Sequence, residues 1–315
     1  MTTSVLLLIA AGLSWTATGI AVGFVERRGF SLVRFQILYC AVSVALGIAG
    51  WAFSQDTFLP HSPCPPRTWI LVVSGTFGCG VFNYLMNMAM GRAMRHGPNA
   101  IVWAIIQSGL IYPFLMGWLA FGVPMGPRRF CGIALIVASV FLYAAREGTG
   151  ISGNGSLHIP LRQWFLPALL GMFCCGINQC GANLPSYIEG GRDFSGTFRA
   201  LSLYSGLLLA ALFHQAIGWK RSHVRKPARQ MEFRTLAVLA AFVGSVSFLA
   251  SKCLSFPGLD RLERLGAGSM GFPIMVASCI IGFLPYGMLV LHERIGAWQT
   301  LGAILGVIGI LLGCL

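Results

Sequence analysis

The sequence predicts an all-α integral membrane protein with ten transmembrane helices, arranged as two inverted five-helix repeats. Three observations carry this prediction: a composition poor in charge, a sequence repeat, and regular alternation of apolar runs with short charged turns. Apolar residues make up 56% of the 315 residues and charged residues 10%, whereas soluble domains carry about 25% charged residues. A membrane span needs about 20 apolar residues, so the chain has room for many.

One stretch of the chain occurs twice, 170 positions apart. Residues 96–142 align without gaps with residues 266–312, and each copy consists of two apolar runs joined by a partly charged turn. The alignment matches small polar and glycine positions as well as apolar ones: Ser108 with Ser278, Gly126 with Gly296, and Gly132 with Gly302. Because an internal repeat marks repeated architecture, we expect a first five-helix repeat at 1–146, a linker loop at 147–162 and a second five-helix repeat at 163–315.

The first half contains five apolar runs separated by turn signals. A charged turn follows the first run, and four prolines at 55–67 exclude a helix from the loop after the second. Pro98 opens the fourth run, where the missing backbone N–H of a proline costs nothing. We therefore predict spans at about 4–25, 32–53, 69–90, 98–121 and 130–145.

The second half repeats this organisation after a polar stretch rich in Gly, Ser and Asn, which is typical of a flexible linker. Its most basic loop lies at 220–234, between the second and third runs of this half. The predicted spans are at about 164–184, 198–219, 235–254, 266–291 and 298–315. An odd number of spans in each half makes the two repeats inverted, and inverted repeats are common in secondary transporters.

The net charge of +13 comes from Lys and Arg placed between apolar runs. The loops after odd-numbered spans hold fourteen of the 22 Lys and Arg residues. Cytoplasmic loops carry such an excess, so we expect a multi-pass inner-membrane protein with the 220–234 loop in the cytoplasm and both termini outside. The same distribution excludes nucleic acid as an expected partner, since the basic residues do not gather on a soluble surface.

The closing residues 293–310 read ERIGAWQTLGAILGVIGI, a Glu at the end of one span followed by a Gly-rich last span. With ten spans in two halves, this pattern resembles the drug/metabolite transporter superfamily of the EamA-like type, and the resemblance implies the fold and a transport function. Val123 stands where the first half would carry the counterpart of Glu293, so the family's paired Glu is incomplete. A fainter likeness, to the L-rhamnose–proton symporter branch, rests on GCGVFNY at 78–84.

Polar side chains inside spans are costly unless they face the bundle interior or a watery cavity. Asn83 and Asn87 share one face of the third span, and Gln179 and Asn183 share one face of the sixth, because each pair is spaced i, i+4. Amides both donate and accept hydrogen bonds, which suits a sugar, nucleoside or amino acid without net charge. The predicted substrate-binding set is Trp15, Asn83, Tyr84, Asn87, Gln107, Asn178, Gln179, Asn183 and Lys252. The alternative is that these amides only join helices to one another.

Lys252 is the one charge well inside an apolar run. It either reaches the membrane surface, if the eighth span ends early, or binds an anionic group of the substrate. No Asp or Glu lies in the middle of a predicted span, so proton coupling is left open. The six histidines are scattered without ligand spacing, and we expect no metal, no cofactor and no catalytic residue.

These observations predict a secondary transporter, not an enzyme, that moves a small polar metabolite across the inner membrane by alternating access. The expected partners are that metabolite and the lipid bilayer, with a homodimer left open. Three alternatives remain: a flippase or carrier for lipid-linked sugars, a multispan membrane enzyme, and a non-transporting sensor. An enzyme would need a deep His, Asp or Ser cluster near one membrane surface, and the sequence contains none.

Overall fold

The computed structural model describes residues 2–53, 64–122, 126–144, 161–221, 230–265, 270–293 and 296–314. Within these ranges every regular element is helical, and no strand occurs. The linker predicted at 147–162 lies almost wholly outside the described residues, as does most of the basic loop at 220–234. The all-α prediction is confirmed for the part of the chain that the structure describes.

The first half is built of long helices with one short break. Its elements are α1 (Thr2–Arg27), α2 (Leu32–Phe53), α3 (Pro66–His96), α4 (Asn99–Gln107), the 3₁₀ turn η1 (Ser108–Leu110), α5 (Ile111–Phe121) and α6 (Pro127–Ala144). The turn η1 keeps backbone hydrogen bonds running from α4 into α5, because the Ser108 N–H bonds carbonyls of the preceding turn. The elements α4, η1 and α5 therefore form one helical rod.

The second half contains two π-helical segments within its long helices. Its elements are α7 (Leu161–Tyr187), the 3₁₀ turn η2 (Gly191–Asp193), α8 (Gly196–Arg221), α9 (Gln230–Ala250), the π-helix η3 (Ser251–Ser255), α10 (Phe256–Arg264), α11 (Gly271–Pro285), the π-helix η5 (Tyr286–Val290) and α12 (Ala297–Cys314). Wider π turns of this kind are frequent at functional sites.

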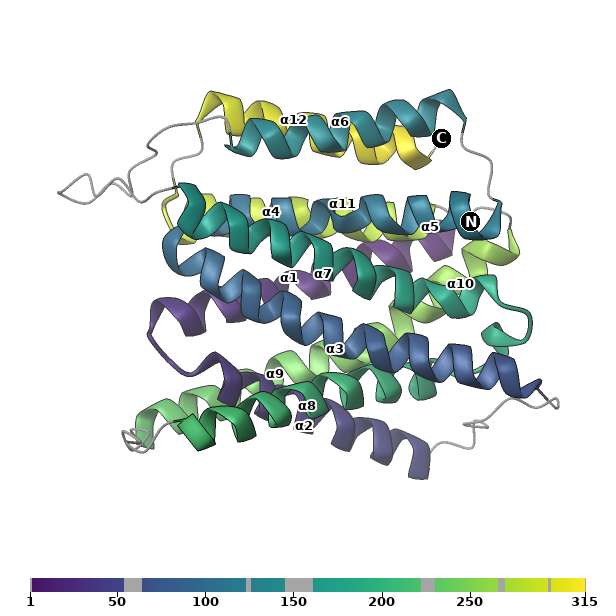
Figure 1. The fold of residues 1–315 in the computed structure, drawn as a ribbon, viewed down its shortest axis with the longest axis horizontal. Coiled ribbons are helices and arrows are strands. Elements are labelled where there is room, and N and C mark those ends of the chain that lie inside the picture. Colours follow the sequence, from purple (N-terminus) through teal and green to yellow (C-terminus); the bar gives the residue numbers. More distant parts are fainter. Residues whose placement is uncertain are drawn as a thin grey trace.

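The helices run roughly along the long axis of the molecule, and successive rods point in opposite directions (Figure 1). Helices α6 and α12 pack together as a pair along one edge, while α2, α8 and α9 lie along the opposite edge (Figure 1). Both termini lie at one end of the bundle (Figure 1). We call this the terminal end, with the connection at 188–195 and the end of α10 at Arg264, and the other the far end, with the connections at 28–31 and 97–98.

Eight helical segments within the described residues are long and apolar enough to cross a membrane, and two shorter apolar stretches lie at Phe130–Ser139 and Thr300–Leu312. Many large apolar side chains are exposed on the outside of the bundle, among them Phe53, Leu119, Val238 and Leu289. Such exposure suits lipid, since a soluble protein rarely shows large apolar patches. The chain is a multi-pass membrane protein.

The eighth span differs most from its prediction. It was expected to end near Leu254, yet helix continues from Glu232 to Arg264 through η3 and α10. Pro257 does not end it, because this proline falls in the first turn of α10, where a backbone N–H is not required. Lys252 therefore lies inside a continuous rod.

Two glycines let α3 and α8 approach closely. A Cβ on Gly80 would come within 1.9 Å of the Leu203 carbonyl oxygen, and a Cβ on Gly206 within 2.1 Å of the Phe77 carbonyl oxygen. Small residues permit such backbone contact between membrane helices. This packing joins the first half of the chain to the second.

Candidate functional site

A cavity of about 90 Å³ lies inside the bundle, between helices of both halves. Its lining comes from α1, α2, α3 and α4 of the first half and from α7, α8, α9, η3, α10 and α11 of the second. Its polar and aromatic lining consists of Trp15, Thr18, Tyr39, Asn83, Trp103, Gln107, Asn178, Gln179, Tyr204, Ser247, Ser251, Ser255, Phe256 and Phe272, with Cys175 beside them. No Asp, Glu, Lys, Arg or His belongs to the lining within the described residues.

One wall of the cavity carries four side-chain amides from α3, α4 and α7: Asn83, Gln107, Asn178 and Gln179. The Cys79 thiol donates to Asn178 Oδ1 at 2.7 Å, and Gln179 Nε2 donates to Cys175 Sγ at 3.2 Å. Gln107 and Gln179 are only 3% and 2% exposed, and the Oε1 of each is buried without a hydrogen-bond partner among the described residues. An unpaired buried acceptor is costly, so these two oxygens are poised to accept bonds from a bound molecule.

A second part of the lining, called the hydroxyl wall below, carries hydroxyl groups from α1, α2, α8, α9 and η3. The Tyr204 and Ser251 hydroxyls are 3.3 Å apart, and those of Thr18 and Ser247 are 3.2 Å apart. The Tyr39 ring meets the Tyr204 ring edge-on, with centroids 5.8 Å apart. The hydroxyl wall can both donate and accept, because each hydroxyl rotates to suit its partner.

Two tryptophans complete the lining. Trp15 leans against Phe272 with ring centroids 6.3 Å apart, and Trp103 stacks on Phe283 at 5.2 Å. Trp103 is 2% exposed, and its indole N–H has the Cys279 thiol as its neighbour. The site therefore combines amides, hydroxyls and indoles around a small uncharged space.

The structure brings together five of the nine residues predicted from sequence: Trp15, Asn83, Gln107, Asn178 and Gln179 all line the cavity. The other four, Tyr84, Asn87, Asn183 and Lys252, lie outside the lining.

Each of these four has other surroundings. The Tyr84 hydroxyl pairs with His214 Nδ1 on α8. Asn87 is fully buried behind Asn83 and donates to Asn83 Oδ1 at 3.0 Å and to Gln36 Oε1 at 3.4 Å. Asn183 is buried, at 6% exposed. The Lys252 ammonium lies beside Gly50 of α2, since a Cβ built on that glycine would be 3.6 Å from Nζ.

Sequence reasoning missed the hydroxyl wall. Three of its members, Ser247, Ser251 and Ser255, recur every four residues and so share one face of a helical rod. That spacing is visible in the sequence and was the available signal. Tyr39 and Tyr204 gave no such signal, because each stands alone in its apolar run.

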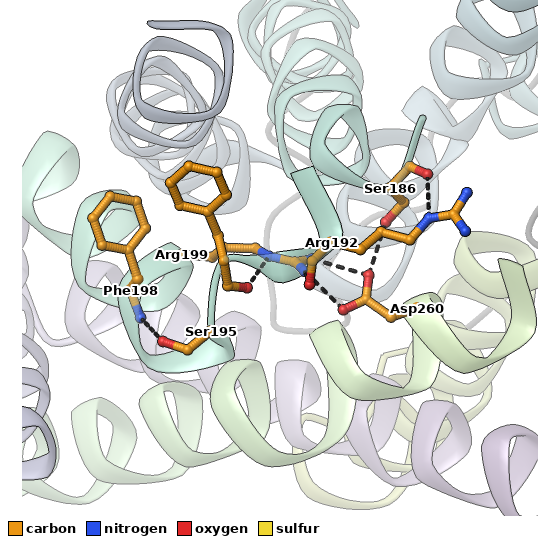
Figure 2. A network of polar contacts seen from close by, with 7 residues as sticks. Ser186, Arg192, Ser195, Phe198, Arg199 and Asp260 are labelled. Atoms are coloured by element: carbon orange, nitrogen blue, oxygen red, sulfur yellow. Dashed lines mark hydrogen bonds and ion pairs between the residues drawn. The ribbon is translucent and has the colours of Figure 1, made fainter. Parts of the chain in front are cut away.

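The terminal end of the bundle is held by a buried ion-pair network (Figure 2). Arg199, near the start of α8, is 0% exposed and binds both carboxylate oxygens of Asp260 on α10, at 3.1 and 2.7 Å. The same guanidinium donates to the carbonyls of Phe194 and Arg192, and Ser186 Oγ donates to Asp260. Ser195 Oγ accepts from the Phe198 N–H at the start of α8 (Figure 2). Helices α7, α8 and α10 are thereby tied together.

The far end carries two ion pairs formed by consecutive residues of α1. Glu26, 8% exposed, binds Arg95 of α3 at 2.6 Å, and Arg27 binds Glu293, beyond η5, at 2.7 Å. The Glu293 carboxylate also accepts from the Asn99 and Ala100 N–H groups at 2.8 and 3.0 Å. These are unsatisfied donors at the start of α4, where a negative charge is stabilised. Glu293 thus connects three rods.

Comparisons with known proteins establish the fold but not the family. No family model and no curated protein matches the chain. A crystal structure of another protein superposes with a TM-score of 0.58 at 15% sequence identity, over 99% of this chain and 96% of that one. At this identity the likeness shows a shared fold alone.

Proposed function

We propose that the chain is a secondary transporter, which moves a small polar metabolite without net charge across the membrane by alternating access. The observation that carries the proposal is the uncharged polar cavity inside the bundle, bordered by helices from both halves. Substrate sites of secondary transporters lie at the interface of two repeats. A buried space of this composition has little structural use on its own, since amides left unpaired inside a protein reduce its stability.

We further propose that ten spans form two inverted repeats, with α1, α2, α3, α4 and α6 as counterparts of α7, α8, α9, α11 and α12. Support comes from the helix packing, which repeats under this exchange. Helix α1 packs on α11 and its counterpart α7 packs on α4; α3 packs on α8 and its counterpart α9 packs on α2. Two further contacts, α6 with α12 and α2 with α8, join counterparts directly, while the extensive packing of α3 on α7 has a smaller counterpart in that of α9 on α1.

The ion pairs at the two ends suggest how access alternates. Each end of the bundle is joined by charged side chains, with Arg199 and Asp260 at the terminal end and Glu26, Arg27, Arg95 and Glu293 at the far end. In alternating access the ion pairs at one end separate while those at the other end stay formed, so that the cavity is open to one side of the membrane at a time. Membership of the drug/metabolite transporter superfamily, placement in the inner membrane and the orientation given above belong to the same proposal.

The test is uptake by the purified chain in liposomes. A panel of radiolabelled sugars, polyols, nucleosides and amino acids is applied, and protein-dependent, saturable uptake of at least one uncharged compound is expected. Replacing the cavity residue Ala182 by Trp fills the space and is expected to abolish uptake. The matched control Leu166→Trp lies on the same helix and faces outward, 55% exposed. Absence of both flux and binding across the panel, with well-folded protein, would remove the proposal.

A further inference from the structure

We infer that the cavity is built for a small uncharged polyhydroxy compound, a polyol or a monosaccharide. The inference rests on the transport function proposed above and narrows its substrate class. It is drawn from the hydrogen-bonding atoms that the lining leaves without partners, from the absence of charge in that lining, and from the size of the cavity.

The lining residues offer two buried acceptors that nothing in the described chain satisfies. These are Gln107 Oε1 on α4 and Gln179 Oε1 on α7. Each belongs to a side chain that is more than nine-tenths buried, so bulk water does not compensate it. A bound molecule that donates to both oxygens removes two unsatisfied groups at once.

The cavity lining also contains hydrogen-bond donors. The side chains of Asn83 and Asn178 are half-buried, their amide oxygens accept from Asn87 and from the Cys79 thiol, and their amide nitrogens are further donors of the lining. Ser255 Oγ is buried and unpaired. A hydroxyl group donates one hydrogen bond and accepts others. Several hydroxyls on one small molecule therefore match a lining that offers amide donors, an unpaired serine hydroxyl and two unpaired acceptors.

Charged substrates do not match this lining. A zwitterionic amino acid or a phosphate needs opposite charges or free backbone N–H groups, and the described lining contains no ionisable residue of either sign apart from tyrosine and cysteine. Two backbone N–H groups at the irregular turns η1 and η3 are already bonded within their own helices. The Ser108 N–H is bonded to preceding carbonyls and the Phe256 N–H to the Ser251 carbonyl. Burying a charge here without a partner would be strongly unfavourable.

The size of the cavity favours the smaller neutral compounds. Its 90 Å³ corresponds to about six water-sized groups at ~15 Å³ each, so a polyol or pentose of about ten non-hydrogen atoms requires less widening of the cavity than a nucleoside of about seventeen. One face of Trp103 is already covered by Phe283, which leaves less room for a nucleobase to stack than for a compact polyol. Apolar C–H groups of such a compound can lie against Trp15 and Phe272.

The first experiment ranks substrate classes with purified protein. Binding in detergent and uptake in liposomes are measured for xylitol, D-ribose and D-glucose, and compared with uridine, L-serine and glucose 6-phosphate. We expect a polyol or sugar to be preferred at least tenfold over the others. Removing one hydroxyl, as in 2-deoxy-D-ribose, should weaken binding roughly tenfold, because a buried amide oxygen then stays unpaired.

The second experiment asks whether the two glutamine oxygens carry the recognition. Gln107→Leu and Gln179→Leu are each expected to raise the KM for the preferred compound roughly tenfold. The matched control is Gln36→Leu, which removes an equally buried amide at 0% exposed that lies outside the cavity lining. Its KM should stay within about twofold of that of the unchanged protein. Monodisperse elution and an unchanged helical circular dichroism spectrum establish that each variant is folded.

The outcomes separate this inference from the proposed function. Preferred uptake of serine, uridine or the sugar phosphate would overturn the inference and leave the transporter standing. Equal KM changes in Gln179→Leu and Gln36→Leu would overturn the assigned recognition even if polyols are carried. If none of the six compounds is transported, the inference is wrong. If no compound of the full panel above is transported either, the proposed transport function is wrong as well.

Discussion

Arg199 is a guanidinium held away from solvent at the terminal end of the bundle, with its side chain 1% exposed. Its charge is matched by Asp260, which accepts two bonds from it, and two backbone carbonyls accept two more. Removing one partner of such a buried pair leaves an uncompensated charge. The residue therefore contributes to stability through its partners rather than through its own burial.

Asp260→Asn is predicted to destabilise the protein by about 3–5 kcal/mol, because the Arg199 charge would remain buried without its counterion. Thermal unfolding in detergent, followed by intrinsic fluorescence, measures the change. Arg34→Gln serves as the control, since Arg34 and Glu232 are 3.8 Å apart with side chains 34% and 19% exposed. Such an exposed pair contributes less than about 1 kcal/mol. Equal effects of the two substitutions would show that the Arg199 pair is not a buried anchor.

A charged residue inside a span can bind substrate or only pack against another helix, and Lys252 allows the two roles to be distinguished. Its side chain lies beside Gly50 rather than in the cavity lining, so Lys252→Met is expected to leave the KM for substrate within about twofold. Uptake kinetics in liposomes measure this. A rise of tenfold or more would restore the ligand role that the sequence alone suggested.

Close packing between α3 and α8 gives a prediction at the scale of the element. Gly80→Ala would place a methyl group against the Leu203 carbonyl and force the two helices apart. We expect a loss of about 1–3 kcal/mol in stability, as for other overpacked sites. Gly78→Ala is the control on the same helix, because a Cβ there meets no atom within 4 Å. Unfolding midpoints that do not differ between the two variants would contradict the close approach.

The far-end closure is a second test at this scale. Glu293→Ala removes the group that links Arg27 to the start of α4, so hydrogen–deuterium exchange should rise in residues 97–101. If the two ends are coupled, exchange should fall in residues 188–196 at the terminal end. Glu232→Ala, which removes a partly exposed pair with Arg34 and an acceptor for the Ser31 N–H, should change neither segment. A rise at both ends would mean that the closures are not coupled.

At the scale of the whole molecule, the sequence predicted the class of fold correctly and only part of the cavity lining. Hydropathy placed the rods well, because a membrane forces the backbone into long helices. Helix ends were harder to place. The eighth span is longer than predicted: it continues past Leu254 to Arg264, since a π turn and a first-turn proline allow the helix to go on. Burial by lipid and burial by protein look alike in an apolar sequence.

Amides in the spans were a sound guide to one wall of the cavity, because a buried amide needs a partner. They could not separate Asn83, which lines the cavity, from Asn87, which lies one turn away and bonds Gln36 instead. That difference depends on how α2 packs beside α3. The serines of the hydroxyl wall do not belong to the predicted set, and a serine in a span is usually satisfied by its own helix, as Ser251 is by the Ser247 carbonyl at 2.9 Å.

The central claim is that one cavity is exposed to the two sides of the membrane in turn, and counterflow tests it most directly. Liposomes containing the protein are loaded with the unlabelled preferred compound and diluted into a trace of the labelled one. An alternating carrier predicts a transient accumulation of label above the outside concentration, which disappears in Ala182→Trp and persists in Leu166→Trp. Simple equilibration of label without this overshoot would indicate a channel and contradict the account.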